Sequence, residues 1–485
     1  MRILLIQPPA SLDKTVGEEY RTHGRFKALR GRDSVFLRPV SLPPLGLMYL
    51  ATPLLNAGHD VEIVDAPTLH LTLGETFAEA EAFKPDAVGI SLYFHTLKPS
   101  WLLTRMIRER LGIPIVLGGP HVTATPDSVF AEYREADHLM TGWGDFTITP
   151  LADMIAGMCG PESVPGLWWR ENGDVRFNPA EPLPDDLDRV PPPNRDVLAN
   201  MYERRMYYNI MSRRRNTDVI MTSRNCPFSC RFCYNLVEHG YLSHSPERVL
   251  SEIRALADRN IDTIEIMDDT FTIHRKRVER ILDGIIEAGL DIDFRIRSRV
   301  NLIDDALLKR LKEAGVRAIS FGMESGSNRV LEFMDKKTTV AMNENAAQLT
   351  KKHGIICHTT WMAGFPGETW SDLEKTFALI RTMLPTTFNI TRLIPLPGTE
   401  VYNEAKRNGS LVGDWGVHKP QPHVRTEIVG DDSQPFGKTI AARYRKLLLN
   451  PRYILRTIRY ALFPPNMRLF RYGIDVVLGR LRNFT

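Results

Sequence analysis

The sequence predicts an α/β protein with a doubly wound, Rossmann-like N-terminal domain, a partial (β/α)6 TIM-like barrel and a helical, basic C-terminal region. Two series of alternating strand-like and helix-like segments run along the chain, and a proline-rich stretch separates them. Basic residues gather at the C-terminal end. A chain of 485 residues is also too long for one ordinary domain.

The first series occupies residues 1–150. Its short apolar runs suit buried strands, and helical patterns separate them, such as residues 45–58, which end on a glycine suited to a helix C-cap. Strands joined through helices by short connections predict a parallel sheet whose ligand lies at the carboxyl ends of the strands. The predicted strands are residues 2–7, 61–66, 87–93, 114–119 and 138–142.

Residues 151–215 interrupt this alternation. The stretch PAEPLPDDLDRVPPPNRD (179–196) and the basic cluster SRRRN (212–216) predict a proline-rich linker. Within it, GLWWRENGDVRF (166–177) predicts a small hairpin.

The second series occupies residues 216–405. Amphipathic helical patterns, for example residues 246–260 and 304–315, separate six strand-like runs. Six strands with helices between them predict an incomplete parallel barrel with its active site at the carboxyl ends of the strands. The predicted strands are residues 218–223, 263–269, 293–300, 318–325, 356–364 and 388–396.

The C-terminal region, residues 406–485, ends in a basic tail. From Lys438 onward eleven Lys or Arg residues accompany only Asp475, and subtracting this +10 from the chain's net +4 leaves −6 for residues 1–437. In PRYILRTIRYALFPP (451–465) the arginines form one helical stripe opposite an apolar one. Such a helix either packs on the barrel or binds an anionic membrane surface. A second basic segment, residues 21–32, has no assigned place.

Composition excludes several classes of protein. No apolar run approaches the ~18 residues of a membrane span, and no secretory signal is expected at the N-terminus. Five cysteines argue against a disulfide framework, so we expect a cytoplasmic protein, with membrane contact at most peripheral. The mildly acidic body argues against nucleic-acid binding.

Three of the five cysteines stand in NCPFSCRFCYN (225–235), directly after the first strand of the second series. Cys226, Cys230 and Cys233 have the spacing C-x3-C-x2-C. Three thiolates can hold three irons of a cubane and leave the fourth iron open. A nucleophile needs only one thiol, and the expected compartment disfavours a disulfide.

Zinc is a further alternative for this cluster. A structural zinc ion needs four ligands, so a histidine would have to complete the set, and the available ones are His239, His244 and, more remotely, His358. The ligand count disfavours this alternative.

With Phe232 just before its last cysteine, this motif resembles that of the radical S-adenosylmethionine (SAM) superfamily. The resemblance implies a [4Fe–4S] cluster on Cys226, Cys230 and Cys233, with SAM on the open iron and Phe232 near the adenine. One electron, from a donor such as flavodoxin or ferredoxin, then cleaves SAM to a 5′-deoxyadenosyl radical.

The same resemblance supplies further SAM-site candidates, each with an alternative. Asp268 or Asp269 is chemically suited to the SAM ammonium, or the acids cap the next helix. Arg297 and Arg299 suit a carboxylate or a salt bridge at the barrel rim. Glu324 and Ser325 match a G-x-E-S-G pattern near SAM, and Gly364 allows close backbone approach or is simply part of a tight turn.

The first domain resembles the cobalamin-binding domains of B12-dependent radical SAM enzymes. No G-x-G-x-x-G follows its first strand, which excludes the dinucleotide fingerprint. The segments that carry the resemblance are PPLGLMYLA (43–51), SLYFHT (91–96), GGPHVTATP (118–126) and TGWGD (141–145). The candidate cobalamin contacts are Ser91, His95, Thr96, Gly118, Gly119, His121 and Gly142.

Two features depart from related cobalamin domains. The D-x-H-x-x-G signature is missing, which implies base-off, His-off cobalamin. TGWGD replaces the usual G-E-G-E, so the resemblance does not assign the detailed contacts of that loop. His121 is more simply a loop histidine held by hydrogen bonds than a metal ligand.

These resemblances imply a cobalamin-dependent radical SAM C-methyltransferase that acts on an unactivated carbon of a small molecule or lipid. The alternative with the same cofactors is a cyclase, ring-forming or rearrangement enzyme in lipid or pigment biosynthesis. A non-catalytic cobalamin or Fe–S sensor is the alternative from another class. Methylthiotransferases need three more cysteines, whereas only Cys159 and Cys357 remain.

Overall fold

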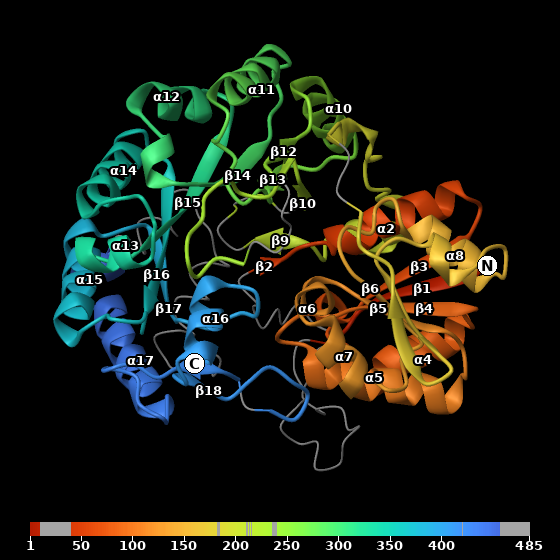
Figure 1. Cartoon of the computed structure of the whole chain (residues 1–485). Coiled ribbons are helices and arrows are strands. Elements are labelled where there is room, and N and C mark those ends of the chain that lie inside the picture. The colour runs from red at the N-terminus through yellow and green to blue at the C-terminus, as the bar shows by residue number, and fades with distance from the viewer. Residues whose placement is uncertain are drawn as a thin grey trace. The chain divides into compact units, whose positions relative to one another are not determined.

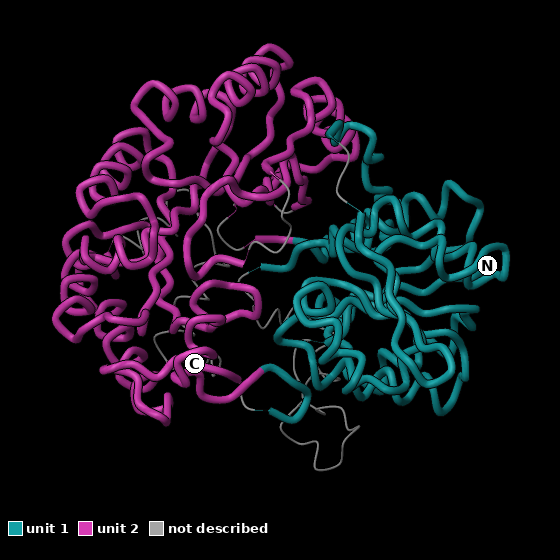
Figure 2. Tube along the Cα trace, viewed as in Figure 1, with its two compact units in different colours: residues 1–207, 415–420 teal, residues 208–414, 421–485 magenta. Residues whose placement is uncertain are grey.

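The computed structural model describes residues 1–9, 40–181, 185–209, 212, 214, 216–234, 240–419 and 421–455. The chain forms two compact units, shown in different colours in Figure 2. Unit 1 comprises Met1–Tyr207 and Trp415–Pro420, and unit 2 comprises Tyr208–Asp414 and Gln421–Thr485. The basic segment 21–32, His239 and the tail from residue 456 lie outside the described residues.

Unit 1 is built on a seven-stranded sheet of order β3-β1-β4-β5-β6-β7-β8. The first five of these strands pair in parallel, as predicted for a doubly wound domain. Both faces are covered, because Leu4 and Leu5 on the inner strand β1 point to opposite faces and are both buried. The parallel strands are β1 (Arg2–Gln7), β3 (Asp60–Asp65), β4 (Ala87–Ser91), β5 (Ile115–Gly118) and β6 (His138–Met140).

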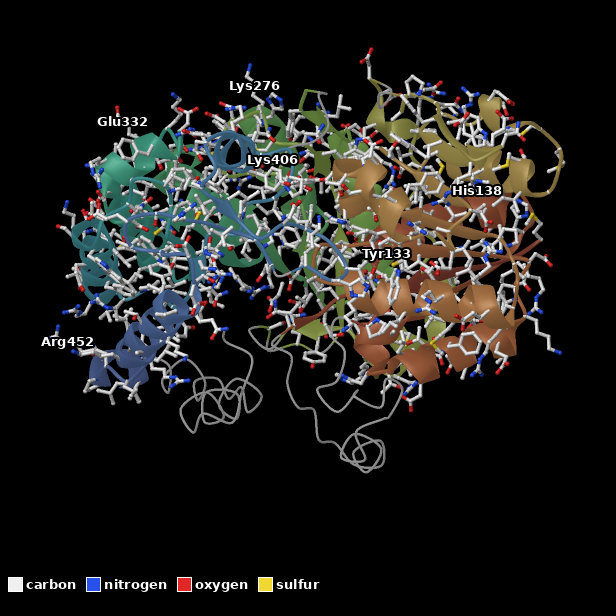
Figure 3. The ribbon with its side chains drawn as sticks, turned by 60° about the horizontal axis from the view of Figure 1, so that its bottom comes forward. Tyr133, His138, Lys276, Glu332, Lys406 and Arg452 are labelled. Carbon is white, nitrogen blue, oxygen red and sulfur yellow. The ribbon has the colours of Figure 1, made fainter. Side chains whose placement is uncertain are left out.

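Helices connect these strands. The helix α4 begins at a capping box in which Thr72 and Glu75 satisfy each other's backbone N–H groups. Tyr133, labelled in Figure 3, is fully buried and donates its hydroxyl to the Leu97 carbonyl, at 2.7 Å. The longer helices of this unit are α2 (Leu45–Asn56), α4 (Leu73–Phe83), α5 (Leu97–Arg110), α7 (Pro126–Glu132) and α8 (Ile148–Ile155).

The predicted hairpin is present as β7 (Leu167–Glu171) and β8 (Asp174–Phe177). It is not isolated in a linker, because β7 pairs antiparallel with β6 and extends the sheet. Residues 151–207, expected from their proline content to be mostly linker, therefore belong to unit 1. Prolines keep this stretch irregular, but they do not prevent its apolar side chains from packing.

Unit 2 contains a six-stranded sheet in chain order, β10-β13-β14-β15-β16-β17, in which every pair is parallel. This is the predicted partial barrel, and Figure 1 shows its helices outside an arc of strands. The strands are β10 (Thr217–Ile220), β13 (Thr263–Ile266), β14 (Asp293–Ser298), β15 (Val316–Glu324), β16 (Ile356–Ala363) and β17 (Thr387–Arg392).

The barrel helices follow the predicted alternation. Their starts are capped by side chains such as Ser245, Asp304 and Thr369, each of which accepts a hydrogen bond from the first helical turn. The helices are α10 (Pro246–Asp258), α11 (Arg275–Glu287), α12 (Asp305–Glu313), α13 (Asn328–Phe333), α14 (Val340–Lys352), α15 (Trp370–Met383) and α16 (Glu400–Arg407).

The described part of the C-terminal region packs on the barrel. Helix α17 (Gln434–Leu448) carries Tyr444, whose hydroxyl donates to the carbonyl of Phe388 in β17 at 3.2 Å. Tyr453 donates likewise to the Thr386 carbonyl at 3.3 Å, and Arg452, labelled in Figure 3, lies exposed beside it. The rest of the predicted basic helix lies outside the described residues.

Candidate functional site: a cysteine loop in unit 2 and a loop cluster in unit 1

The three cysteines lie in an irregular loop that follows β11 (Ser223–Arg224). Arg231, in the middle of the loop, donates its backbone N–H to the Met334 carbonyl and accepts from the Val401 N–H, both at 3.1 Å. Its guanidinium contacts Glu400 and Glu404 of α16. The loop is therefore fixed on two sides by elements from later in the chain.

Asp268 fixes the start of this loop. It is fully buried at the end of β13 and accepts four hydrogen bonds, from the backbone N–H and hydroxyl groups of Thr222 and Ser223. These acceptor interactions occupy both carboxylate oxygens. Of the two predicted candidates for the SAM ammonium, Asp268 therefore has a structural role, which leaves Asp269.

Asp269 is exposed, yet burial of its carboxyl raises its pKa, with Arg297 opposing the rise. Arg297 is also exposed and donates to the Met267 carbonyl at 3.2 Å. Both side chains are open to a ligand, and their roles toward SAM stay predictions.

The three thiols interact electrostatically. Burial raises the pKa of Cys233 to about 11, and Cys230, Asp269 and Cys226 act in the same direction while Lys336 opposes them. Cys226 lies 3.9 Å from the Thr270 hydroxyl, and the Cys233 N–H donates to the Cys230 carbonyl at 2.9 Å. The structure thus places Cys233 within electrostatic reach of the other two thiols, of Asp269 and of Lys336.

Phe232 packs against an apolar cluster that includes Phe365. Its ring lies 6.4 Å from that of Phe365, and the Lys336 Nζ lies 5.6 Å from the ring centroid. One side of the ring is thus anchored, while the residue stays half-exposed. The predicted contact of Phe232 with adenine is compatible with this position.

The G-x-E-S-G segment ends β15. Glu324 adopts a positive φ of 61° and pairs through Oε1 with Lys336 Nζ at 3.0 Å. Ser325 is fully buried, and its hydroxyl accepts from the Ser327 N–H at 3.1 Å. A Cβ on Gly326 would lie 2.6 Å from Thr376 Cα, so glycine permits α15 to approach. These contacts shape the strand end, and direct SAM contacts of Glu324 and Ser325 stay predictions.

Glu368 stabilises the turn after β16 through a hydrogen bond to the turn's backbone. Its Oε2 accepts from the Gly364 N–H at 2.6 Å, whereas its Oε1 is buried without a partner among the described residues. Gly364 has a φ of 84°, which favours glycine, and a Cβ there would lie 3.0 Å from Val429. Gly364 had indicated a close backbone approach or a tight turn, but the buried Glu368 was missed.

These residues suit an iron–sulfur cluster better than a single ion. Among the described residues no three His, Cys, Asp or Glu side chains are arranged to hold one metal ion. A cubane binds each thiolate through a different iron, so its ligands need not converge on one point. Three thiols in one fixed loop, with no fourth cysteine in it, fit a cluster that leaves one iron open.

In unit 1 the loops after β4, β5 and β6 meet at the carboxyl edge of the sheet. The Leu92 N–H donates to the Gly118 carbonyl at 2.7 Å, and the His121 N–H donates to the Leu92 carbonyl at 3.2 Å. Gly142 donates to the Thr123 hydroxyl at 3.1 Å. The predicted ligand edge of the sheet is therefore one connected surface.

A glycine without a side chain and a threonine hydroxyl set the shape of this edge. Gly119 has a φ of 101°, and a Cβ there would lie 3.0 Å from the Leu92 carbonyl, so a larger residue would separate the two loops. The buried hydroxyl of Thr96 accepts from the Tyr93 N–H at 3.0 Å. The His95 ring lies 5.6 Å from that of Tyr93 and is exposed, whereas Ser91 is half-buried.

His121 is almost fully buried at this edge. Its Nδ1 has no hydrogen-bond partner within the described part of the chain, and Nε2 lies 3.5 Å from the Thr125 hydroxyl. Burial lowers its pKa to about 4, so the imidazole is neutral at pH 7. The predicted hydrogen-bonded loop histidine is thus only half-satisfied, and an orphaned polar atom at the predicted ligand edge fits a domain that binds a polar cofactor.

One contributor to this edge was not predicted from the sequence. Trp415 follows the barrel in the chain but packs in unit 1, with its ring 4.9 Å from that of Phe94 and 6.4 Å from that of His121. The Val417 N–H donates to Glu132 at 2.9 Å. The segment WGVH (415–418) has no periodicity, and the only available signal was a buried-type tryptophan in an otherwise polar stretch.

Comparisons with known proteins agree with this arrangement. The model of the Radical SAM superfamily matches residues 220–380, and that of the B12 binding domain matches residues 35–152. Over 467 residues the chain is 31% identical to the uncharacterized methyltransferase PH0819 of Pyrococcus horikoshii, with 94% of this chain and 95% of the relative covered.

Other similar proteins differ in the reaction that their names describe. An anaerobic magnesium-protoporphyrin IX monomethyl ester cyclase of Rubrivivax gelatinosus is 28% identical over 425 residues, covering 85% of this chain and 75% of the relative. The hopanoid C-3 methylase of Methylococcus capsulatus is 26% identical over 385 residues, covering 77% and 70%.

Solved structures share the fold. The cobalamin-dependent S-adenosylmethionine radical enzyme OxsB, with aqua-cobalamin and S-adenosylmethionine bound, superposes with a TM-score of 0.72 at 18% identity, covering 97% of this chain and 72% of OxsB. The methyltransferase TsrM from Kitasatospora setae gives 0.66 at 18% identity, covering 85% and 80%. Within the described residues, no helix has the length and apolarity to cross a membrane.

Two matched domains, the three-cysteine loop and a relative aligned over nearly the whole chain lead to one assignment. The resident cofactors are those of the family: a [4Fe–4S] cluster, SAM and cobalamin. The chain belongs to the cobalamin-binding radical SAM enzymes.

Proposed function

We propose that the chain is a C-methyltransferase that acts on an unactivated carbon of a small molecule. The observation that carries the proposal is the 31% identity to a protein named as a methyltransferase, along 94% of this chain. The hopanoid methylase, which is named for a C-methylation, supports the same reaction class. When bound, the cluster with SAM supplies the 5′-deoxyadenosyl radical and cobalamin supplies the methyl group.

The chain's own residues bind and orient these groups. Cys226, Cys230 and Cys233 each hold one iron as a thiolate. Asp269, desolvated yet accessible, accepts from the SAM ammonium, and Arg297 donates to its carboxylate. These two assignments rest on the charge and exposure of the side chains.

The same loop and its neighbours position the nucleoside. Phe232 lies against the adenine, held from behind by Phe365. The turn at Gly364 provides backbone groups near the base, and Glu368 fixes that turn.

In unit 1 the proposed cobalamin contacts are the residues of the connected sheet edge. The exposed or half-buried members offer hydrogen bonds or close backbone approach, and His121 offers its free Nδ1 to a polar group of the corrin periphery. No side chain is assigned as a cobalt ligand, in keeping with the base-off, His-off cobalamin that the family resemblance implies. The proposed contacts are Ser91, His95, Thr96, Gly118, Gly119, His121 and Gly142.

Ring formation is the second candidate. The observation that favours it is the 28% identity to a magnesium-protoporphyrin monomethyl ester cyclase over 85% of this chain. Methyl transfer consumes a second SAM and releases S-adenosylhomocysteine, whereas ring formation does not. The family is one of enzymes, which disfavours a non-catalytic sensor.

One experiment separates the two reactions. Reconstituted enzyme is incubated with a reductant, an extract of source cells and SAM that carries a deuterated methyl group. Methyl transfer predicts 5′-deoxyadenosine, S-adenosylhomocysteine and a deuterium-labelled product by mass spectrometry. Substrate-dependent deoxyadenosine without label or S-adenosylhomocysteine would overturn methyl transfer in favour of ring formation.

Two partner assignments complete the proposal. A low-potential donor such as flavodoxin or ferredoxin supplies the electron in the cytoplasm. The basic C-terminal tail contacts an anionic membrane surface peripherally when the substrate is a lipid. Co-sedimentation with anionic liposomes tests the second point, and equal binding by a chain truncated at residue 437 would contradict it.

A further inference from the structure

We propose that Arg299 is a positioning residue for the iron–sulfur cluster, which it holds through Cys230 and whose reduction potential it raises. Sequence reasoning had placed Arg299 with Arg297 as a partner for the SAM carboxylate. The inference rests on the cluster assignment and does not depend on whether the enzyme methylates or cyclises.

The first observation is a direct contact with a cluster ligand. Arg299 follows β14, and its Nη1–H donates to the Cys230 Sγ at 3.4 Å. The guanidinium carbon lies 3.8 Å from the ring centroid of Phe228, in the same loop. Its other Nη donates to the Lys336 carbonyl. These three contacts fix the direction of the N–H that approaches the sulfur.

The second observation is an unbalanced buried charge. Arg299 is 6% exposed, and its Nε is buried without a partner among the described residues. Within that part of the chain no carboxylate forms an ion pair with it. The neighbouring cation Lys336 is already paired with Glu324 at 3.0 Å. Since burying an isolated cation is costly, Arg299 requires an anion that the protein itself does not supply.

A thiolate-ligated cluster is such an anion. Reduction adds one electron and no proton, so the reduced cluster carries one more unit of negative charge than the oxidised cluster. A buried cation stabilises the reduced state more, and hydrogen bonds to cluster sulfurs act in the same direction. Arg299 therefore makes reduction by the electron donor more favourable. Its contact with Cys230 Sγ also orients that ligand before the cluster is inserted.

The test is a redox titration of the full-length, reconstituted protein without SAM. The wild type is compared with Arg299→Met, Arg299→Gln and Arg299→Lys, and iron and sulfide contents are measured for each. The cluster is reduced with dithionite through mediators and followed by electron paramagnetic resonance. Arg317→Met is the matched control. Arg317 lies at the N-terminal end of β15, whereas Arg299 follows the C-terminal end of the parallel neighbour β14, and the loss of either arginine changes the net charge equally.

Loss of the charge is expected to lower the equilibrium constant for reduction at least tenfold, which is about 59 mV for a one-electron couple. Arg299→Met and Arg299→Gln show this shift, Arg299→Lys keeps most of the wild-type potential, and Arg317→Met keeps all of it. An unchanged potential in a fully loaded Arg299→Met protein would overturn the inference.

Two further outcomes are decisive. If Arg299→Met does not retain iron, the reduction potentials of Arg299→Lys and Arg299→Gln are compared instead, since both side chains keep an N–H donor and differ in charge. Equal potentials in these two variants contradict the inference. Weaker SAM binding without any shift in potential also contradicts the inference. It would show instead that Arg299 binds the SAM carboxylate. A wild-type protein that binds no iron refutes the cluster assignment itself, whatever the variants do.

Discussion

Lys336 and Glu324 form a buried ion pair beside the cysteine loop, with Nζ and Oε1 3.0 Å apart and both side chains about nine-tenths buried. Glu324 reaches this position by way of a positive φ in β15, and Gly322 leaves room for it, because a Cβ there would lie 2.3 Å from Oε1. The pair neutralises one cation near the thiols.

Breaking this pair is predicted to destabilise unit 2. Lys336→Met leaves a buried carboxylate without its partner, which costs about 3–5 kcal/mol. Urea denaturation of the cluster-free protein measures the loss. The double variant Lys336→Met/Glu324→Leu should recover much of it, since no buried charge remains. A double variant as unstable as the sum of the single changes would contradict this explanation.

Replacing one cluster cysteine is predicted to abolish radical formation. Cys230→Ala removes a ligand, so reconstituted protein should lose most of its iron and release no 5′-deoxyadenosine above background. Liquid chromatography of the products and iron analysis provide the measurement. Cys159→Ala is the control, because Cys159 lies in unit 1, far along the chain from the loop. Continued deoxyadenosine formation by Cys230→Ala would contradict the cluster assignment.

Substitutions of the two adjacent aspartates, Asp268 and Asp269, are predicted to have different effects. Asp268→Asn replaces an acceptor of four hydrogen bonds with a group that can accept with one oxygen only, so iron retention and thermal stability should both fall. Asp269→Asn should keep its iron but bind SAM at least tenfold more weakly. Iron content and SAM titration separate these effects. The reverse pattern would exchange the two roles.

Glu368 is predicted to make stability depend on pH. Burial raises its pKa to about 7 from an ordinary value of 4.5, despite hydrogen bonds from Gly364 and Phe365 that act in the opposite direction. The protonated form therefore favours the fold. This contribution is complete below pH 4.5 and is lost as the pH rises to about 7, on the order of 3 kcal/mol.

Glu368→Gln tests this dependence. The variant should be more stable than wild type at pH 8, and its urea midpoint should change less between pH 6 and pH 8. Burial lowers the pKa of His121 to about 4, so protonation of this histidine in the unfolded chain also contributes over this interval, but it does so in both proteins and cancels in their comparison. Parallel pH curves for the two proteins would show that another group is responsible.

Trp415 is predicted to support unit 1 and its cofactor. Trp415→Ala removes a buried ring beside Phe94 and His121, which costs about 3–5 kcal/mol when the cavity does not collapse. Cobalamin retained after desalting, read from its absorption, should fall. Phe177→Ala is the matched control in unit 1, because that ring is 57% exposed. Equal retention by both variants would contradict the prediction.

Local patterns in the sequence predicted most of the fold and the centre of the site. The run at residues 2–7 is continuously apolar and residues 293–300 alternate, which are both strand signals, and the spacing of the cysteines is independent of tertiary structure. The distinction between Asp268 and Asp269 was not predictable, because it depends on which carboxylate meets Thr222 and Ser223 from another strand.

Roles that depend on long-range partners were missed in the same way. Arg297 lies in β14 and Arg299 directly follows this strand, yet Arg299 is buried against Cys230 and Arg297 is exposed, and only tertiary packing decides between them. Trp415 offered no pattern at all, since its partners precede it by about three hundred residues. Proline content suggested a linker where side chains of residues 151–207 pack in unit 1.

The return of Trp415–Pro420 to unit 1 has a consequence for how the protein is made. Residues 1–207 leave the ribosome first, but their aromatic partner is synthesised only after all six strands of the barrel. The unit synthesised first is thus completed late, and its final packing cannot precede the emergence of the barrel. A ribosome stalled just before residue 415 would hold a nascent chain whose B12 domain still lacks the indole that packs beside Phe94 and His121.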